Sequence, residues 1–141
     1  MTIERIIEGR HDIVTCPASA TVREAAGLLA ERRIGAMPVM DGDSIAGIFS
    51  ERDVLYRLRE FGAELLDKPV REVMTAPAVT VDPTTSAMTA LAMMTKRRIR
   101  HLPVVEGGRM VGFVSIGDIV KYRIDKVEGE AAALRDYIQM A

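Results

Sequence analysis

Two serine–aspartate pairs with the same spacing stand out as candidates for chemistry: Ser50 with Asp53, and Ser115 with Asp118. At the first turn of a helix, such a pair caps free backbone N–H groups, and the acid favours the positive end of the helix dipole. The same carboxylate can accept hydrogen bonds from the hydroxyls of a ribose, and a helix N-terminus attracts phosphate. The pairs therefore predict helix caps, contacts to a sugar and its phosphate, or both.

A run of basic residues at 96–101 (K-R-R-I-R-H) offers a place for an anion. Its first half, like the pair Arg32–Arg33, fits the C-terminal end of a helix, where cations offset the dipole. Arg100 and His101 come after that helix, and they are our main candidates for phosphate contacts because a phosphate needs charge-assisted donors. Arg52, next to Asp53, is a further candidate.

A flat ring such as a purine needs an apolar slot with hydrogen bonds at its edge. Core packing accounts for most apolar residues, but some near the predicted strand ends could line such a slot. The candidates are Ile34, Met37, Pro38, Ile99, Pro103 and Phe113. Thr15 and Thr80 are either ordinary strand residues or contacts to the base.

The elements that must position these groups occur twice. When the chain is compared with itself at an offset of 65 residues, 12 positions are identical between residues 14–55 and 79–120. Both serine–aspartate pairs fall on equivalent positions, so each repeat carries one. The basic groups do not, since Gly35 and Ala36 stand where the second repeat has Arg100 and His101.

Each repeat predicts the element order β-α-β-β-α. A short strand (residues 14–16 and 79–81) precedes a helix with Thr21 or Ser86 as N-cap, and Thr21-x-x-Glu24 has the form of a capping box. Two strands joined by a glycine-containing turn follow (36–40 with 45–49, and 101–105 with 110–114), and a second helix begins at the serine of each pair. Short helices are expected at residues 1–9, at 70–75 and at the C-terminus.

One repeat is too small to bury a sufficient core alone. We therefore expect an α+β fold in which the two repeats pack with pseudo-twofold symmetry, leaving two related clefts between them.

Composition excludes several classes of protein. The 141 residues are 48% hydrophobic and 28% charged, with a formal charge of −1, so a basic nucleic-acid-binding surface is not expected. The single cysteine, Cys16, excludes an internal disulfide and a cysteine-cluster zinc site. No apolar run approaches the roughly 20 residues that span a bilayer, so we expect a cytoplasmic protein.

The repeated motifs, R-R-I-G-A-M-P-V…G-I-F-S-E-R-D and R-R-I-R-H-L-P-V-V…G-F-V-S-I-G-D, resemble those of CBS domains. Two ordered sets at one offset make the chain similar to a CBS domain pair, or Bateman module, of the small stand-alone type. On this resemblance, residues 12–60 and 77–125 are the two repeats, 61–76 connects them, and 126–141 is a C-terminal helix. The whole chain is then one module.

The resemblance implies a non-catalytic regulatory module that senses energy or redox state. Such pairs bind adenine nucleotides between their repeats, with AMP our first expectation and ADP, ATP or NAD(H) as others. In the family pattern the aspartate contacts ribose and basic residues contact phosphate. The resemblance also implies a homodimer and no required metal, while the regulated partner is unknown.

Three alternatives remain open at this stage. The module could bind S-adenosylmethionine, it could be a structural pairing module with empty clefts, or it could be a nucleotide-hydrolysing enzyme.

Overall fold

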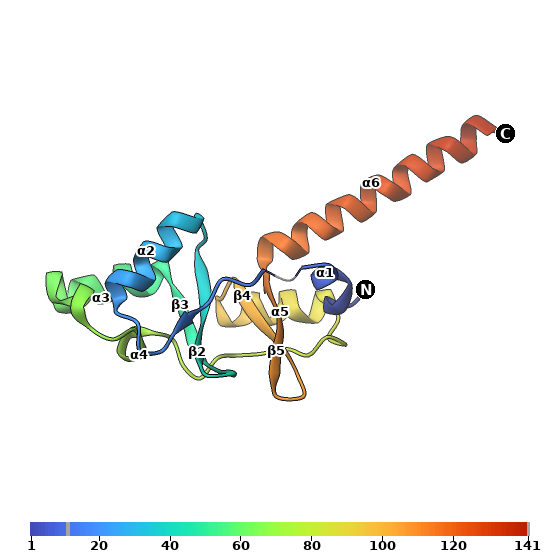
Figure 1. Ribbon diagram of the computed structural model, residues 1–141. Helices are drawn as coiled ribbons and strands as arrows, with labels where there is room; N and C mark the ends of the chain where they lie inside the picture. The colour runs from blue at the N-terminus through green and yellow to red at the C-terminus, as the bar shows by residue number, and fades with distance from the viewer. Residues whose placement is uncertain (11, 141) are drawn as a thin grey trace.

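The computed structural model describes residues 1–10 and 12–140 and contains two small αβ units with a long helix extending from the second (Figure 1). The first unit consists of β1 (Cys16–Pro17), α2 (Val22–Arg32), β2 (Ala36–Asp41), β3 (Ser44–Ser50) and α3 (Glu51–Phe61). The second consists of α5 (Ala87–Arg97), β4 (His101–Glu106), β5 (Arg109–Ser115) and α6 (Ile116–Met140). The predicted α+β class and the duplicated element order are confirmed.

The hairpins of the two units have the same register. Ala36 pairs with Ser50 and His101 with Ser115, and both hairpins shift register at the equivalent point, after Val39 and after Val104. The predicted first strand of each repeat is too long, however. β1 begins only at Cys16, and its counterpart in the second unit is a single parallel bridge between Val81 and Val104. The pairing extends past Pro17 instead, where the N–H of Ala18 donates a hydrogen bond to the carbonyl oxygen of Met40 at 2.8 Å.

The predicted helix caps are confirmed, with one correction. The Thr21 hydroxyl accepts a hydrogen bond from the Glu24 N–H at 3.1 Å, and the Ser86 hydroxyl accepts one from the Thr89 N–H at 3.0 Å. The Glu24 carboxylate contacts the Thr21 hydroxyl instead of the backbone, so the predicted capping box is not completed. Thr21 lies opposite Pro69 in an isolated bridge whose hydrogen bonds are made by the neighbouring residues, from the Val22 N–H to the Lys68 carbonyl and from the Val70 N–H to the Ala20 carbonyl.

Each unit is completed by the segment that precedes the other unit. Helix α1 (Ile3–Ile7) begins the chain, yet Ile3 and Ile6 are buried in the core of the second unit. The connecting segment, with the 3-10 helix η1 (Gly62–Asp67) and α4 (Val70–Val73), buries Leu65, Val70 and Val73 in the core of the first unit. The predicted short helix near residue 70 is therefore confirmed, and the N-terminal helix is part of a core.

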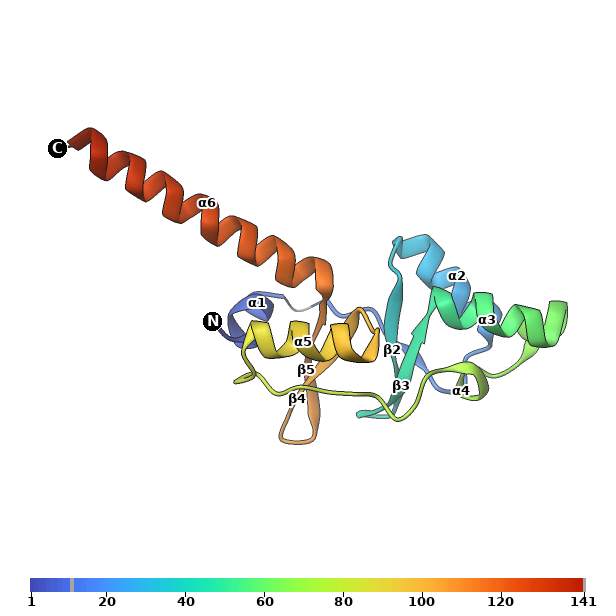
Figure 2. The same cartoon turned by 180° about the vertical axis from the view of Figure 1, so that it is seen from behind.

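Helix α6 runs from Ile116 to Met140 without a break. The sequence suggested two elements here, a helix that ends the second repeat and a separate C-terminal helix, and the structure joins them. Figure 2 shows this helix projecting away from both units. The described residues contain no helix that is both long enough and apolar enough to cross a membrane.

Two equivalent glycines allow a close approach of chain segments to the hairpins. A Cβ atom on Gly47 would lie 2.7 Å from the carbonyl oxygen of Thr75, and one on Gly112 would lie 2.9 Å from Cδ1 of Ile7. The obstacle at Gly47 is backbone, held by two hydrogen bonds between Ile48 and Thr75. The obstacle at Gly112 is a movable side chain.

We therefore expect Gly47→Ala to lower the free energy of unfolding by about 1–3 kcal/mol, and Gly112→Ala to lower it less. Urea denaturation followed by circular dichroism measures both. Gly129→Ala, which meets nothing within 4 Å, is the control and is expected to stabilise α6. Equal losses for Gly47 and Gly112 would contradict this account of the close approach.

Candidate functional site

Two clefts lie between the units at positions related by the repeat. The first, with a cavity volume of about 380 Å³, surrounds the start of α3 and includes Ser50, Asp53, residues 75–79 and residues 98–101. The second, about 350 Å³, surrounds the start of α6 and includes Ser115, Asp118, Arg10, residues 12–14 and residues 34–36. We call them the Asp53 cleft and the Asp118 cleft. Both volumes fall within the range of small-molecule sites.

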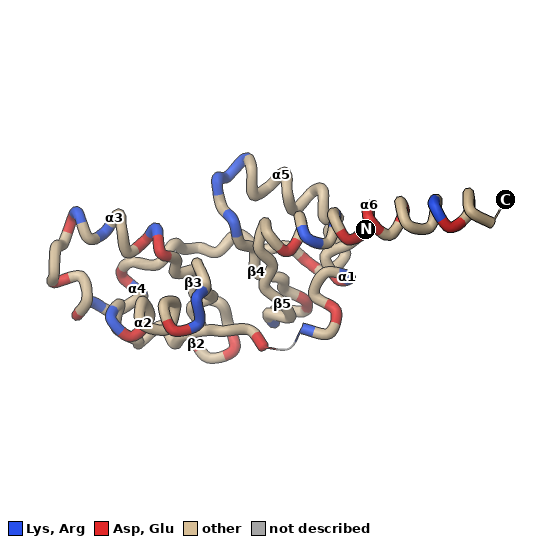
Figure 3. The backbone as a smooth tube through the Cα atoms, turned by 90° about the horizontal axis from the view of Figure 1, so that it is seen from above, with Lys and Arg blue, Asp and Glu red and all other residues tan. Residues whose placement is uncertain are grey.

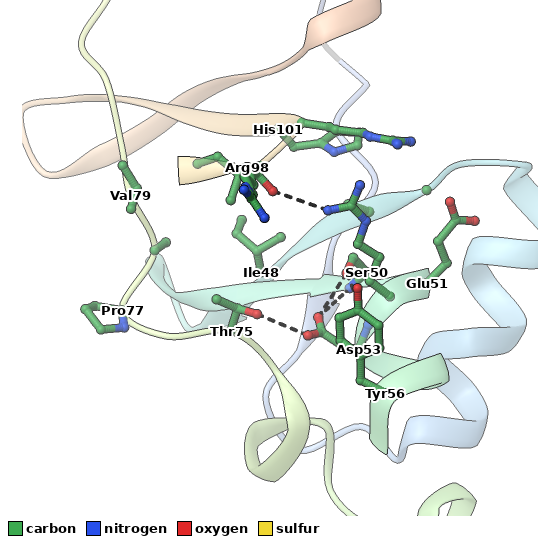
Figure 4. Close-up of a pocket in the computed structure, with 16 residues that line it drawn as sticks. Ile48, Ser50, Glu51, Asp53, Tyr56, Thr75, Pro77, Val79, Arg98 and His101 are labelled. Carbon is green, nitrogen blue, oxygen red and sulfur yellow. Dashed lines mark hydrogen bonds between the residues drawn. The ribbon is translucent and has the colours of Figure 1, made fainter. Parts of the chain in front are cut away.

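The carboxylate of Asp53 is held at the N-terminus of α3 by a complete capping box. Its Oδ2 accepts hydrogen bonds from the N–H of Ser50 at 2.9 Å and from the Ser50 hydroxyl at 3.1 Å. Its Oδ1 accepts one from the hydroxyl of Thr75 at 3.1 Å (Figure 4). Both partners are neutral, and among the described residues no cationic side chain forms an ion pair with this carboxylate, which lies on the wall of the cleft.

The carboxylate of Asp118 is held in the same way on one side and differently on the other. Its Oδ2 accepts the N–H of Ser115 at 2.8 Å, as in the first repeat. Its Oδ1 is bound by the guanidinium of Arg10 at 2.9 Å. Arg10 thus takes the position that Thr75 has in the other cleft, at the same offset of 65 residues.

The Arg10 ion pair also contributes to a lowered pKa of Asp118. Desolvation of this half-buried carboxyl by itself would raise its pKa, but hydrogen bonds from Ser115 and Arg10 outweigh it and hold the pKa below the usual value. The ion pair is only partly shielded, because the Arg10 side chain is 46% exposed and that of Asp118 is 26% exposed. Its net energy is therefore modest, and its main effect is to occupy the carboxylate oxygen.

Cations gather around the Asp53 cleft. Arg98 ends α5 in a left-handed conformation, and its carbonyl oxygen accepts a hydrogen bond from Nη1 of Arg52 at 3.2 Å, so Arg52 links the two units (Figure 4). Arg100 is exposed on the same wall. Figure 3 shows the basic end of α5 beside this region. In the second repeat Gly117 replaces Arg52, so the Asp118 cleft has no equivalent link.

His101 borders both clefts. Its ring stacks on that of Phe113, with centroids 5.3 Å apart and planes at 14°. Burial is the main cause of a lowered pKa, which the Arg100 charge lowers further and the charges of Asp118 and Glu51 partly restore. His101 is therefore mainly neutral at pH 7, which suits ring stacking and hydrogen bonding better than pairing with a phosphate.

The remaining predicted residues divide into two groups. Ile34, Ile99 and Phe113 line the clefts. Met37 is fully buried in the first core, and Pro38 and Pro103 are buried across their hairpins from the cleft residues Ile48 and Phe113. Thr15 borders a separate cavity near Met110, and Thr80 is exposed on the segment before Val81.

Sequence reasoning missed the residues that distinguish the two clefts. Thr75 and Arg10 lie before the repeat as first aligned, which began at Val14 and Val79. Extending the same offset by four residues pairs Arg10 with Thr75 and Asp12 with Pro77, and that signal was present in the sequence. Tyr56, which lines the Asp53 cleft from the second turn of α3, had no such signal.

A protein-family model for the CBS domain matches this chain twice, at residues 3–60 and 70–125. The chain belongs to the CBS domain family. The two matches include α1 and α4, the elements that complete the cores of the opposite units. The chain is thus a CBS domain pair, and the resemblance of its repeated motifs is confirmed.

Curated relatives contain the same pair in proteins of different lengths. The chain is 34% identical over 129 residues to the mitochondrial CBS domain-containing protein CBSX3 of Arabidopsis thaliana, covering 88% of this chain and 63% of that protein. It is 31% identical to the CBS domain-containing protein YhcV of Bacillus subtilis, covering 85% and 83%. It also matches inosine-5'-monophosphate dehydrogenase of Mycobacterium tuberculosis at 37% identity, but spans only 20% of that enzyme.

Solved structures share the fold over most of the chain. A CBS-domain containing protein from Agrobacterium tumefaciens superimposes with a TM-score of 0.83 at 35% identity, covering 87% of this chain and 99% of that one. A CBS domain protein from Pyrobaculum aerophilum, solved in complex with AMP, has a TM-score of 0.74 at 30% identity, covering 84% and 89%.

The environment of His101 predicts a response to acid. Because its folded-state pKa lies below the ordinary value of 6.5, protonation penalises the folded state, and the free energy of unfolding falls as the pH drops below 6.5. Asp118 stays ionised over this range because its pKa lies below 3.8. We expect Asp118→Asn to lower the pKa of His101 further and Arg100→Gln to raise it. An NMR titration of the imidazole, assigned with His101→Gln, measures both shifts, and shifts of the opposite sign would refute this electrostatic description.

Proposed function

We propose that this CBS domain pair is a non-catalytic regulatory module that binds an adenine nucleotide, with AMP as the first candidate, in the Asp53 cleft. The observation that carries the proposal is the Asp53 carboxylate, whose Oδ1 receives only the neutral hydroxyl of Thr75 within the described residues. A ribose diol can join or replace that hydroxyl without breaking an ion pair. The Pyrobaculum relative solved with AMP supports the choice of ligand.

The other parts of a nucleotide find matching chemistry in the same cleft. Arg52, Arg98 and Arg100 lie along one wall and supply charge-assisted donors for a phosphate. Ile48 and Val79 (Figure 4), together with Ile99, supply an apolar surface for a base. The cationic wall favours a phosphate ester over S-adenosylmethionine, whose sulfonium is itself a cation.

A regulatory role agrees with the chemistry of the one thiol in the chain. Cys16 is 3% exposed, and burial raises its pKa to about 11, so it stays protonated and is not a nucleophile at neutral pH.

Both units form the Asp53 cleft, so a ligand bound there contacts both of them. Binding can therefore change the orientation of one unit relative to the other. The module would then report nucleotide levels, and with them energy state, through its shape or its partner.

The two aspartates provide a matched test of the site. Asp53→Ala is expected to weaken AMP binding by about 10- to 100-fold, the effect of losing a charged acceptor. Asp118→Ala removes the same helix-capping acid from the other repeat and is expected to leave the affinity within about twofold. Isothermal titration calorimetry with AMP, and with S-adenosylmethionine as competitor, measures both. Equal effects would contradict the assignment, and no heat for either ligand at millimolar concentration would favour the ligand-free structural module.

Exchanging the residues that distinguish the clefts provides a second test. Thr75→Arg should place a guanidinium on Asp53, as Arg10 does on Asp118, and abolish binding in the Asp53 cleft. Arg10→Thr should free the Asp118 carboxylate but leave the described lining of that cleft without a Lys or Arg for the phosphate, so the stoichiometry should stay at one AMP per chain. Calorimetric stoichiometry decides the matter. Two molecules bound per wild-type chain would show that the Arg10 ion pair does not close the second cleft.

A further inference from the structure

The outer part of α6 has an apolar face that no other described segment of the chain covers. Ile116, Ile119 and Tyr122 pack against the core of the second unit, and beyond them the helix runs away from both units (Figures 1 and 2). Of the thirteen large hydrophobic side chains that are exposed among the described residues, seven lie on α6. Helices in proteins are stabilised mainly by packing of such a face, so this segment lacks the contact that would hold it.

The exposed apolar residues follow a heptad pattern. Intervals of four and three residues alternate from Val120 to Ile138, which is the period of a coiled coil. In heptad notation, a positions are Ile124, Ala131 and Ile138, and d positions are Val120, Val127 and Leu134. Isoleucine at a with leucine at d favours two strands, and Ile138 with Leu134 fits that pattern, whereas valine takes the other two d positions and alanine one a position. The residues that contact the core, such as Ile119 and Tyr122, lie on another face of the helix.

We propose that α6 pairs with α6 of a second copy of this chain as a parallel, in-register two-stranded coiled coil. The surface that mediates it, which we call the α6 seam, consists of Val120, Ile124, Val127, Ala131, Leu134 and Ile138. The homodimer expected from the sequence is thereby given a specific interface, orientation and register. The twofold axis runs along the coil, and both CBS domain pairs lie at its N-terminal end.

Charges beside the seam select the parallel orientation. In a parallel coil each g residue faces the e residue five positions further on in the partner. Arg123 then faces Glu128 of the partner subunit, and Glu130 faces Arg135 of the partner subunit, so both types of pair are attractive.

An antiparallel pairing of the same seam is disfavoured. With Val127 opposite position 131 of the partner, Glu128 would face Glu128 of the partner subunit, and Glu130 would face Glu130 of the partner subunit. Lys121 would face Arg135 of the partner subunit. Each of these pairs has like charges. A lipid surface is a poorer partner as well. Residues 123–140 carry three basic and four acidic side chains, without the basic face that membrane-surface helices use.

The first experiment compares Leu134→Asp, in the seam, with Ala133→Asp, one residue away and outside it. Sedimentation equilibrium at micromolar concentration is expected to give twice the 15.5 kDa chain mass for the wild type and for Ala133→Asp. Leu134→Asp is expected to be monomeric. Its AMP affinity, and the circular dichroism that reports the folded CBS domain pair, are expected to persist. A monomeric wild type, or a dimer that survives Leu134→Asp, overturns the proposal. A wild-type monomer that binds anionic vesicles would assign the face to lipid instead.

The second experiment determines orientation. Leu134→Cys is expected to form an intermolecular disulfide under mild oxidation, because only a parallel coil brings equivalent d positions within bonding distance. Asp136→Cys, on the outer face, is the control, and the buried Cys16 does not interfere. Arg123→Glu is expected to raise the dimer dissociation constant about tenfold, and adding Glu128→Arg to restore it within about twofold. No disulfide at position 134, or no rescue by the double exchange, refutes the parallel register.

Discussion

The exchange of segments between the two repeats is the constraint on which the rest of the structure depends. Neither repeat buries a complete core by itself, so α1 covers the second repeat and η1 with α4 covers the first. Each covering segment must then cross the boundary between the repeats to reach its own strand. The crossing segments form walls of the two clefts, with Arg10 and residues 12–14 in one and Thr75 and residues 77–79 in the other. The clefts are therefore a consequence of how the cores are completed.

Duplication supplies two equivalent frames, and single residues make them chemically different. Both carboxylates are anchored through Oδ2 by the serine of their own pair. At Oδ1 the first meets a threonine hydroxyl and the second a guanidinium. His101 lines both clefts, and its neutral ring stacks on Phe113, which lines the Asp118 cleft. This one side chain therefore connects the two clefts. Two clefts that share one backbone frame thus present a carboxylate held by neutral groups in one and by a guanidinium in the other.

The α6 helix connects a cleft to the outside of the molecule. Asp118 lies in its first turn, and Ile119 and Tyr122 in its first two turns pack in the core of the second unit. The α6 seam begins between them, at Val120. Any change at the Arg10–Asp118 pair is therefore applied to the base of the helix that carries the proposed interface. Because helices are stiff along their axis, a small rotation at Asp118 becomes a larger displacement at Ile138.

The sequence alone determined the features that depend on local chemistry and on duplication. The hairpins and the caps at Thr21, Ser86 and Ser50 follow from residue spacing within one segment. The repeat and the CBS family follow from the recurrence of that spacing 65 residues later. The tertiary structure decided what depends on segments far apart in the chain: that Ile3 completes the core of the second repeat, that Arg10 binds Asp118, and that burial lowers the pKa of His101. Local patterns indicate which face of an element is buried but not which distant segment covers it, and side-chain charge at a cleft depends on that distant partner.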